Sequence, residues 1–254
     1  TVNDAQLSVE ALAVKDGKIL AVGTRAEIEK AHRGATTKVV DLGGKALLPG
    51  FLDAHSHYIS SLTVANQVNV YAPPAGPGKD VDSIVAELVK YRDANKIPKG
   101  EVIQAYGYDE NVMPTGRQLN RDHLDKALPD HPVLVGHVSM HGAVLNSAAM
   151  KKWGLSAQTK TPPGGVIVRK PGTQEPWGLI METAYLPIFA SLPQPTKEQE
   201  VAWSKAGQML YAQHGVTTAH EGASHLGDLE VMKRAADGGA TLIDVVAYPF
   251  ITDL

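Results

Sequence analysis

Leu47-Leu48-Pro49-Gly50-Phe51-Leu52-Asp53-Ala54-His55-Ser56-His57-Tyr58 predicts a buried strand that ends in metal-ligand side chains. A Pro-Gly breaker opens the segment, a short apolar run follows, and two histidines one residue apart close it. Side chains alternate along a strand, so His55 and His57 are predicted to face the same side, with Asp53 one step back on it. Two imidazoles that converge from one strand end can hold one divalent metal ion.

A His-x-His pair is weak evidence by itself, because ten histidines in 254 residues can produce one by chance. The alternative is a structural pair, hydrogen-bonded beneath a loop. The context favours metal binding, since the breaker, the apolar run and the Asp-x-His-x-His ending occur in the expected order. Asp53 is expected to orient one histidine or to cap the turn rather than to bind the metal.

The segment Pro-Gly-Phe-Leu-Asp-Ala-His-Ser-His (49–57) resembles the first barrel strand of the amidohydrolase superfamily of metal-dependent hydrolases. Three longer phrases resemble its branch called amidohydrolase family 3, which includes N-substituted formamide deformylases. They are GYDENVMPTGRQLNRDHLDKALPDHPVLVGHVSMHGAVLNSAAM (107–150), PPGGVIVRKPGTQEPWGLIMETA (162–184) and HGVTTAHEGA (214–223). The resemblance covers essentially the whole chain.

The resemblance implies an α/β fold: a partial (β/α)8 TIM-type barrel preceded by part of a small β-sandwich domain. We expect the sandwich part at 1–48, with a hairpin turning at Asp16-Gly17 and two strands around Gly43-Gly44. The barrel part is expected at 49–254, because strand and helix patterns alternate there and predict parallel βα units.

Two features interrupt the expected barrel. The stretch at about 156–176 is rich in Gly, Pro and Thr and is expected to leave the barrel, as a hairpin over its mouth, with a helix over 177–190 after it. The chain ends after the fifth predicted strand, so it cannot close eight strands alone. We therefore expect an N-terminal portion of a longer protein, and the unpaired edges of an open barrel predict self-association.

Composition narrows the function classes. A chain that is 43% hydrophobic over 254 residues can bury a barrel-sized core. Its formal net charge of −3 gives no basic surface for nucleic acid. The absence of cysteine leaves histidine, carboxylate or modified lysine as metal ligands. No apolar run approaches the length of a membrane span, so we expect a cytoplasmic protein, with an exported form that has lost its signal peptide as the alternative.

In such barrels the active face lies at the carboxyl ends of the strands. His55 and His57 are the predicted metal ligands there. Glu182, on a predicted helix, and His220, at a strand end, are candidates for a metal or catalytic role, with structural or core roles as alternatives. The expected substrate-pocket residues are Tyr108, Asp109, His141 and Asn146. For these four the alternative is a hydrogen-bond network at the strand ends, or a helix N-cap in the case of Asn146.

The resemblance implies hydrolysis of an amide-type, non-peptide C–N bond in a small molecule by metal-activated water. Zinc is the default metal for imidazole and carboxylate ligands, with iron, manganese and nickel open. The family's later ligands and its proton-transfer aspartate have no counterpart in this sequence. A deaminase or cyclic-amide hydrolase of the same superfamily is the alternative activity, and a catalytically silent ligand-binding fragment is the alternative from another class.

Overall fold

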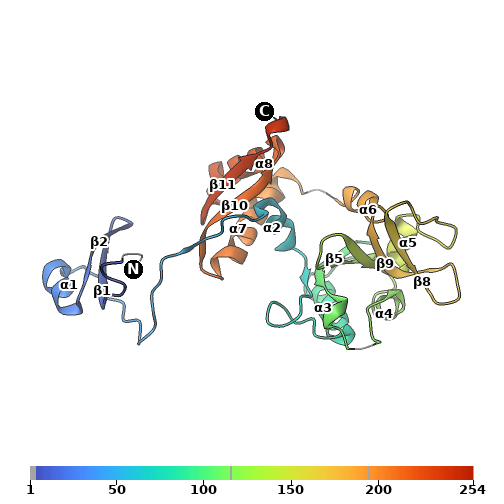
Figure 1. Cartoon of the computed structure of the whole chain (residues 1–254), viewed down its shortest axis with the longest axis horizontal. Coiled ribbons are helices and arrows are strands. Elements are labelled where there is room, and N and C mark those ends of the chain that lie inside the picture. The colour runs from blue at the N-terminus through green and yellow to red at the C-terminus, as the bar shows by residue number, and fades with distance from the viewer. Residues whose placement is uncertain (1–3, 115, 194, 254) are drawn as a thin grey trace.

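The computed structural model describes residues 4–114, 116–193 and 195–253, which form three separate sheets (Figure 1). The first is an antiparallel hairpin of β1 (Ala11–Lys15) and β2 (Lys18–Gly23), followed by α1 (Arg25–His32). Asp16 and Gly17 adopt positive φ angles of 52° and 74°, as a tight hairpin turn requires, and the predicted hairpin is confirmed.

The two strands expected around Gly43-Gly44 do not form. Residues 33–50 contain no helix or strand, and the side chains of 34–50 are exposed along their whole length. Figure 1 shows this segment as an extended connection between the hairpin and the rest of the chain. A strand needs a partner for its backbone groups, and none of the described residues pairs with this segment. That part of the prediction was wrong.

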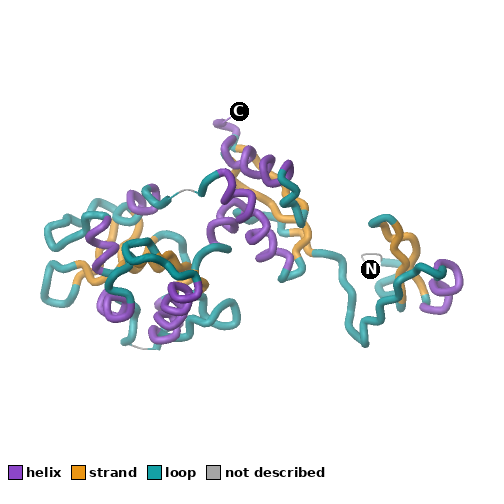
Figure 2. The backbone as a smooth tube through the Cα atoms, turned by 180° about the vertical axis from the view of Figure 1, so that it is seen from behind, coloured by secondary structure: helices purple, strands orange, loops and turns teal. Residues whose placement is uncertain are grey.

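The second sheet is parallel and carries the His-x-His segment. It contains β3 (Phe51–Leu52), β10 (Val216–Ser224) and β11 (Asp244–Pro249) in the order β11-β10-β3. The helices α2 (Tyr58–Val64), α7 (Lys197–Ala212) and α8 (Leu226–Asp237) lie against one side of it (Figure 2). Tyr58, Leu62, Ala219 and Ile243 form the buried core between the sheet and these helices.

The other face of this sheet is open. Leu52 is 71% exposed and Tyr248 is 49% exposed, and both lie on strands of the sheet. The register places Leu52 beside Thr218, and Thr218 beside Asp244. Apolar and polar side chains on this face are therefore accessible to solvent.

The third sheet has six strands and forms a lobe of its own, which we call the six-stranded lobe (residues 66–193). Its order is β4-β5-β6-β7-β9-β8, parallel from β4 to β6 and antiparallel from β6 to β8. The strands are β4 (Val68–Asn69), β5 (Ile103–Tyr108), β6 (Val133–His137), β7 (Gly142–Leu145), β8 (Gly165–Arg169) and β9 (Pro176–Glu182).

Helices surround this lobe and bury its core. They are α3 (Val81–Ala94), α4 (Arg121–Ala127), α5 (Ser147–Lys152) and α6 (Leu186–Ala190), with a 3-10 turn, η1 (Glu110–Val112). In α3 one apolar face is buried, with Val81, Ile84 and Leu88 at 1% exposure or less. Asp80 caps this helix, because its carboxylate accepts from the Ser83 backbone N–H at 2.7 Å.

The α/β class is confirmed, but the strands are distributed differently from the sequence prediction. The five strands from residue 49 onward were expected in one barrel sheet. Instead, β10 pairs directly with β3, so the six-stranded lobe is inserted between two neighbouring parallel strands. The expected excursion does form a hairpin, of β8 and β9, but as the edge of this lobe rather than over a barrel mouth.

The prediction of a helix over 177–190 was wrong for its first half. Residues Pro176–Glu182 form β9, because their burial alternates residue by residue against the neighbouring strands, and only Leu186–Ala190 is helical. Glu182 therefore lies at a strand end and not on a helix. At the end of the chain, a second 3-10 turn, η2 (Ile251–Asp253), follows β11. None of the helices in the described ranges is long and apolar enough to cross a membrane.

Candidate metal centre

The His-x-His segment is attached to the carboxyl end of β10 by a series of hydrogen bonds. The backbone N–H of Asp53 donates to the Thr218 carbonyl at 2.9 Å, and that of Gly222 donates to the Ser56 carbonyl at 2.9 Å. The Ser56 hydroxyl donates to the His220 carbonyl at 2.7 Å. These bonds fix the residues on both sides of the histidines, so the imidazoles are positioned by backbone contacts rather than by a flexible loop.

His55 and His57 lie side by side at this strand end. Their ring centroids are 5.6 Å apart with the rings nearly perpendicular, and the His57 side chain is 54% exposed. A structural pair buried beneath a loop would not be this accessible. The Asp53 carboxylate accepts from the His55 backbone N–H at 3.2 Å, as a residue that caps this turn would.

Glu221 is a site residue that the sequence reasoning missed. It is 2% exposed, and its carboxylate accepts from the backbone N–H groups of Ile59 at 2.7 Å and Ala223 at 3.1 Å. The same carboxylate lies 3.5 Å from His57 Nδ1. Histidine ligands commonly direct their second nitrogen to a carboxylate, which orients the ring and raises its basicity. Glu221 therefore leaves His57 Nε2 as the nitrogen that can face a metal.

His220 sits next to Glu221 and projects from the opposite side of β10. Its Nδ1 lies 2.9 Å from the Ala54 carbonyl, which can only accept, so Nδ1 carries the proton and Nε2 the lone pair. The Tyr248 hydroxyl lies 3.3 Å from the same nitrogen. Within the described residues, no three histidine, aspartate or glutamate side chains converge closely enough to hold a metal ion. His55 and His57 are thus two candidate ligands, and the described residues bring no third one close enough to complete a set.

Gly222 makes room for the His55 ring. A Cβ at this position would lie 2.4 Å from His55 Cε1 and 2.7 Å from Nδ1, so the ring would have to move. We expect Gly222→Ala to weaken zinc binding about tenfold or more, because a displaced His55 ring no longer directs its nitrogen toward the metal. Competition against a chelating dye measures the affinity. Gly227→Ala is the matched control, since its Cβ would meet nothing within 4 Å, and equal affinities for the two variants would contradict this prediction.

The predicted substrate-pocket residues lie on the six-stranded lobe. Tyr108 is 1% exposed, and its hydroxyl accepts from the Leu119 backbone N–H at 3.2 Å. Burial raises the pKa of this phenol to about 12, so it stays neutral. Asp109 caps the 3-10 turn η1 by accepting from the Asn111 N–H at 2.9 Å. Both residues are held by local contacts at the carboxyl end of β5.

His141 and Glu182 form an exposed pair on the same lobe. His141 Nδ1 lies 3.2 Å from both carboxylate oxygens of Glu182, and the Glu182 backbone N–H donates to the His141 carbonyl at 2.8 Å. Met140 and Glu182 have positive φ angles of 63° and 54°, an uncommon conformation for residues other than glycine. The structure thus brings together two residues that the sequence reasoning had placed in different roles.

Asn146 is the N-cap of α5, which confirms the capping alternative. The residue is 0% exposed. Its amide oxygen accepts from the backbone N–H groups of Val133 and Ala149, each at 2.9 Å. Its amide nitrogen donates to the carbonyls of Leu128 and His131 at 3.1 and 2.8 Å. All four hydrogen-bonding positions of the amide are therefore used inside the lobe.

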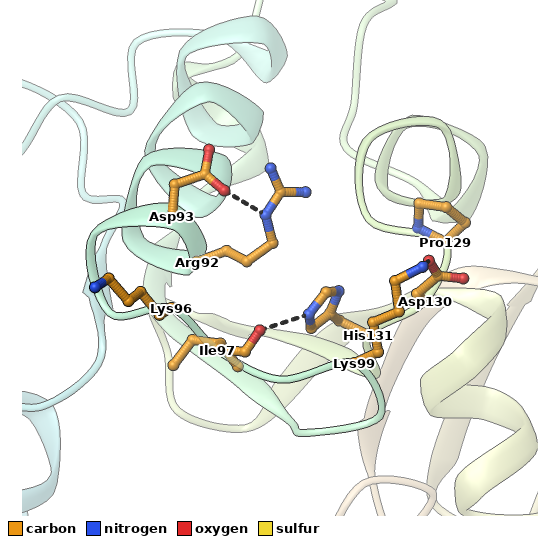
Figure 3. A pocket seen from close by; sticks show the side chains of 8 residues that line it. All are labelled: Arg92, Asp93, Lys96, Ile97, Lys99, Pro129, Asp130 and His131. Carbon is orange, nitrogen blue, oxygen red and sulfur yellow. Dashed lines mark hydrogen bonds and ion pairs between the residues drawn. The ribbon is translucent and has the colours of Figure 1, made fainter.

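A pocket of about 450 Å³ lies elsewhere, at the amino ends of β5 and β6 (Figure 3). Its charges are largely paired within the pocket, with Arg92 Nε 2.8 Å from Asp93 and Lys99 Nζ 2.6 Å from Asp130. Ligands of open α/β sheets bind outside the carboxyl ends of the strands. This pocket is therefore not the site that the histidine pair would use. Its lining residues are Arg92, Asp93, Lys96, Ile97, Lys99, Pro129, Asp130 and His131.

Comparison of this chain with known proteins identifies a family. A family model described as "Amidohydrolase family" matches residues 38–254, and an imidazolonepropionase-like composite domain of bacteria matches residues 11–35. The chain is 32% identical over 248 residues to the putative amidohydrolase YtcJ of Bacillus subtilis, covering 95% of this chain and 44% of YtcJ. It is 27% identical over 237 residues to the N-substituted formamide deformylase of Arthrobacter pascens, covering 93% of this chain and 42% of that enzyme.

A solved structure shares the fold. The uncharacterized metal-dependent hydrolase from Pyrococcus horikoshii aligns with a TM-score of 0.56 at 21% identity, over 94% of this chain and 44% of that protein. The chain therefore spans less than half the length of the relatives it matches. Since the family model covers the histidine pair, the six-stranded lobe and β10 together, the chain belongs to the amidohydrolase family.

Proposed function

We propose that this chain supplies the metal-binding strand of a hydrolase that cleaves an amide-type, non-peptide C–N bond in a small molecule. The observation that carries the proposal is the pairing of His57 Nδ1 with the buried carboxylate of Glu221 at the carboxyl end of a parallel strand. A carboxylate behind an exposed imidazole is the usual support of a metal-binding histidine. The family and the metal-dependent hydrolase of similar fold support the same activity.

The residues present fit a divalent metal in part. Two accessible imidazoles from one strand end suit zinc, with iron, manganese or nickel as alternatives, and His220 is the third candidate ligand. When bound, such a metal lowers the pKa of a water molecule and polarises a carbonyl group. The remaining ligands and the proton-transfer aspartate are proposed to lie outside this chain, because the described residues complete no set of three.

The chain's own residues would orient and hold these groups. The Glu221 carboxylate lies 3.5 Å from His57 Nδ1 and so leaves Nε2 as the nitrogen that would face a metal. Asp53 fixes the turn that carries His55. The Ala54 carbonyl accepts from His220 Nδ1 and so fixes the tautomer of that imidazole. His220 Nε2 is left as a proton acceptor on the open face of the sheet. His57 and His220 thus each have one nitrogen available for the metal or for the substrate.

The six-stranded lobe is proposed to contribute to the substrate pocket. Four of the residues expected from the sequence lie at the strand ends of this lobe: Tyr108, Asp109, His141 and Glu182. The barrel assignment of 49–254 and the sandwich assignment of 1–48 remain part of the proposal. The edge strands β3 and β11, which have one paired neighbour each among the described residues, support self-association as a further expectation.

Glu221→Gln should weaken zinc binding about 10- to 100-fold, as loss of a carboxylate behind a ligand histidine commonly does. Isothermal titration with zinc measures the effect. Ile59 and Ala223 donate to different oxygens of Glu221, so glutamine keeps an acceptor for one of these two N–H groups. Circular dichroism of the variant therefore accompanies the titration and verifies the fold. Glu175→Gln is the control, because Glu175 is an exposed carboxylate of the six-stranded lobe that pairs with Arg121 of the same lobe. An unchanged affinity for Glu221→Gln would remove the support for the proposed role of Glu221.

A substrate screen tests the reaction class. Formamides, linear amides, cyclic amides and amino-substituted heterocycles are incubated with a zinc-loaded protein that carries this chain together with the proposed remaining ligands, with and without a chelator. Chelator-sensitive release of amine from the first two groups supports the proposal. Turnover of cyclic amides or ammonia release from heterocycles would instead favour the alternative activities of the superfamily, and tight metal binding without any turnover would favour a ligand-binding role.

A further inference from the structure

A second chain of catalytic-type groups lies on the six-stranded lobe, away from the histidine pair. The Ser139 hydroxyl is 2.7 Å from His137 Nδ1, and His137 Nε2 is 2.5 Å from the carboxylate of Glu110. A hydroxyl within hydrogen-bond reach of an imidazole, which a carboxylate orients in turn, is the arrangement that activates a serine nucleophile. None of these three residues has a part in the proposed metal chemistry.

The hydrogen bonds fix which nitrogen of His137 is the base. The backbone N–H of Ser139 donates to Nδ1 at 3.1 Å, and an N–H can only donate. Nδ1 is therefore the unprotonated nitrogen, and it also accepts from the Ser139 hydroxyl. The one ring proton is on Nε2 and points to Glu110. This tautomer is the one in which His137 can take the hydroxyl proton.

The surroundings favour reactivity at Ser139. Its side chain is exposed, whereas the His137 side chain is 8% exposed and packs edge-on against Tyr108 with ring centroids 6.2 Å apart. Ser139 follows the carboxyl end of β6, beside β5, which is the edge where parallel sheets bind ligands. Met140, the next residue, has a φ of 63°, and backbone strain of this kind is common at active sites.

The geometry points to Ser139 as the nucleophile of a second acyl-transfer site, with His137 as its base and Glu110 as the group that orients the base. The class of substrate is a small, uncharged carboxylic ester. Ser139 Oγ would bond to the ester carbonyl carbon while its proton moves to His137 Nδ1. The C–O bond to the alcohol then breaks, and that alcohol leaves with the proton. Water, deprotonated by His137, releases the acid and restores the serine.

The His141 backbone N–H supports this chemistry. It donates to Ser139 Oγ at 3.2 Å and so fixes the hydroxyl oxygen beside His137. The His141 imidazole, paired with Glu182, stands next to the same turn. These groups place one hydrogen-bond donor and one further proton-transfer group beside the nucleophile.

Covalent labelling of the full chain with an alkyl fluorophosphonate tests the proposal, with peptide mass spectrometry to locate the adduct. In this reaction Ser139 Oγ displaces fluoride from phosphorus, and His137 takes the proton. We expect stoichiometric labelling at Ser139 that persists after metal chelation. His137→Gln should slow it about 100-fold, in the range of general-base contributions, and Glu110→Gln should slow it to a smaller degree. Circular dichroism of each variant verifies the fold.

Ser147 is a matched control within the same lobe. It is also exposed, and its hydroxyl contacts a carboxylate, that of Asp125 at 2.5 Å, but no imidazole. Ser147→Ala should leave the labelling of Ser139 unchanged. The proposal is overturned if Ser139 labels no faster than Ser147, or if folded His137→Gln labels at the wild-type rate. Because labelling needs no metal, its failure would leave the proposed metal-dependent function untouched.

Discussion

Replacing both His55 and His57 with alanine should reduce bound divalent metal from near-stoichiometric to background, and with it any chelator-sensitive hydrolysis. The two imidazoles are the accessible donors at the end of β3, with ring centroids 5.6 Å apart. With both removed, His220 is the remaining imidazole of the site, and one neutral nitrogen cannot replace a ligand set. Elemental analysis of the chain after dialysis against zinc measures the effect.

The single variants refine this prediction. His57 has the Glu221 carboxylate behind it, whereas His55 is held against Gly222 by packing. We therefore expect His57→Ala to lose more metal than His55→Ala. His214→Ala is the control, because His214 is an exposed histidine whose Nδ1 contacts the Leu210 carbonyl at 2.7 Å, far along the chain from the pair. If the double variant binds as much metal as the wild type, the prediction is contradicted and the ions bind elsewhere on the chain.

Asn146→Ala should destabilise the six-stranded lobe by about 3 to 5 kcal/mol. Four backbone groups lose their partner at once, and the residue is 0% exposed, so water cannot replace the amide. Each buried group left unsatisfied costs about 1 to 3 kcal/mol, and relaxation recovers part of the sum. The lost hydrogen bonds are those by which Asn146 connects α4, β6 and α5.

Urea unfolding followed by tryptophan fluorescence measures this effect, because Trp153 and Trp177 both belong to the lobe. We expect a separate transition for the lobe, and only that transition should move to lower urea in Asn146→Ala. Ser147→Ala, one residue away and exposed, should shift it little, since its bond to Asp125 is at the surface. A lobe transition that stays at the wild-type midpoint would contradict the structural role of Asn146.

Local features of the sequence predicted local structure well. The Asp16-Gly17 turn depends on a few adjacent residues, and it has the expected geometry. The strand before the histidine pair was only partly predicted. A strand does form there, but it contains only Phe51 and Leu52, which are 54% and 71% exposed rather than buried, and it ends before the histidines. The pairing of β3 with β10 was not predicted, since it joins residues more than 160 positions apart and skips the whole six-stranded lobe.

Glu221 shows why part of the site was missed. The strand pattern draws attention to His220, and one residue further the side chain turns to the buried face. A glutamate there is unusual, because carboxylates are rarely buried without partners. Its partners, the Ile59 N–H and His57, come from the other end of the chain and appear only when β10 lies beside the His-x-His segment. The signal available in the sequence was an acidic residue directly after the strand-end histidine.

The most direct measurement of the metal centre is a long-range ¹H–¹⁵N spectrum of the histidine side chains during titration with zinc. We predict that the Nε2 resonances of His55 and His57 shift as zinc binds, while His57 Nδ1 keeps its proton toward Glu221. His131 and His214, which lie away from the pair, should not respond. Zinc binding that leaves the resonances of His55 and His57 unchanged would contradict the assignment of this strand end as the metal centre.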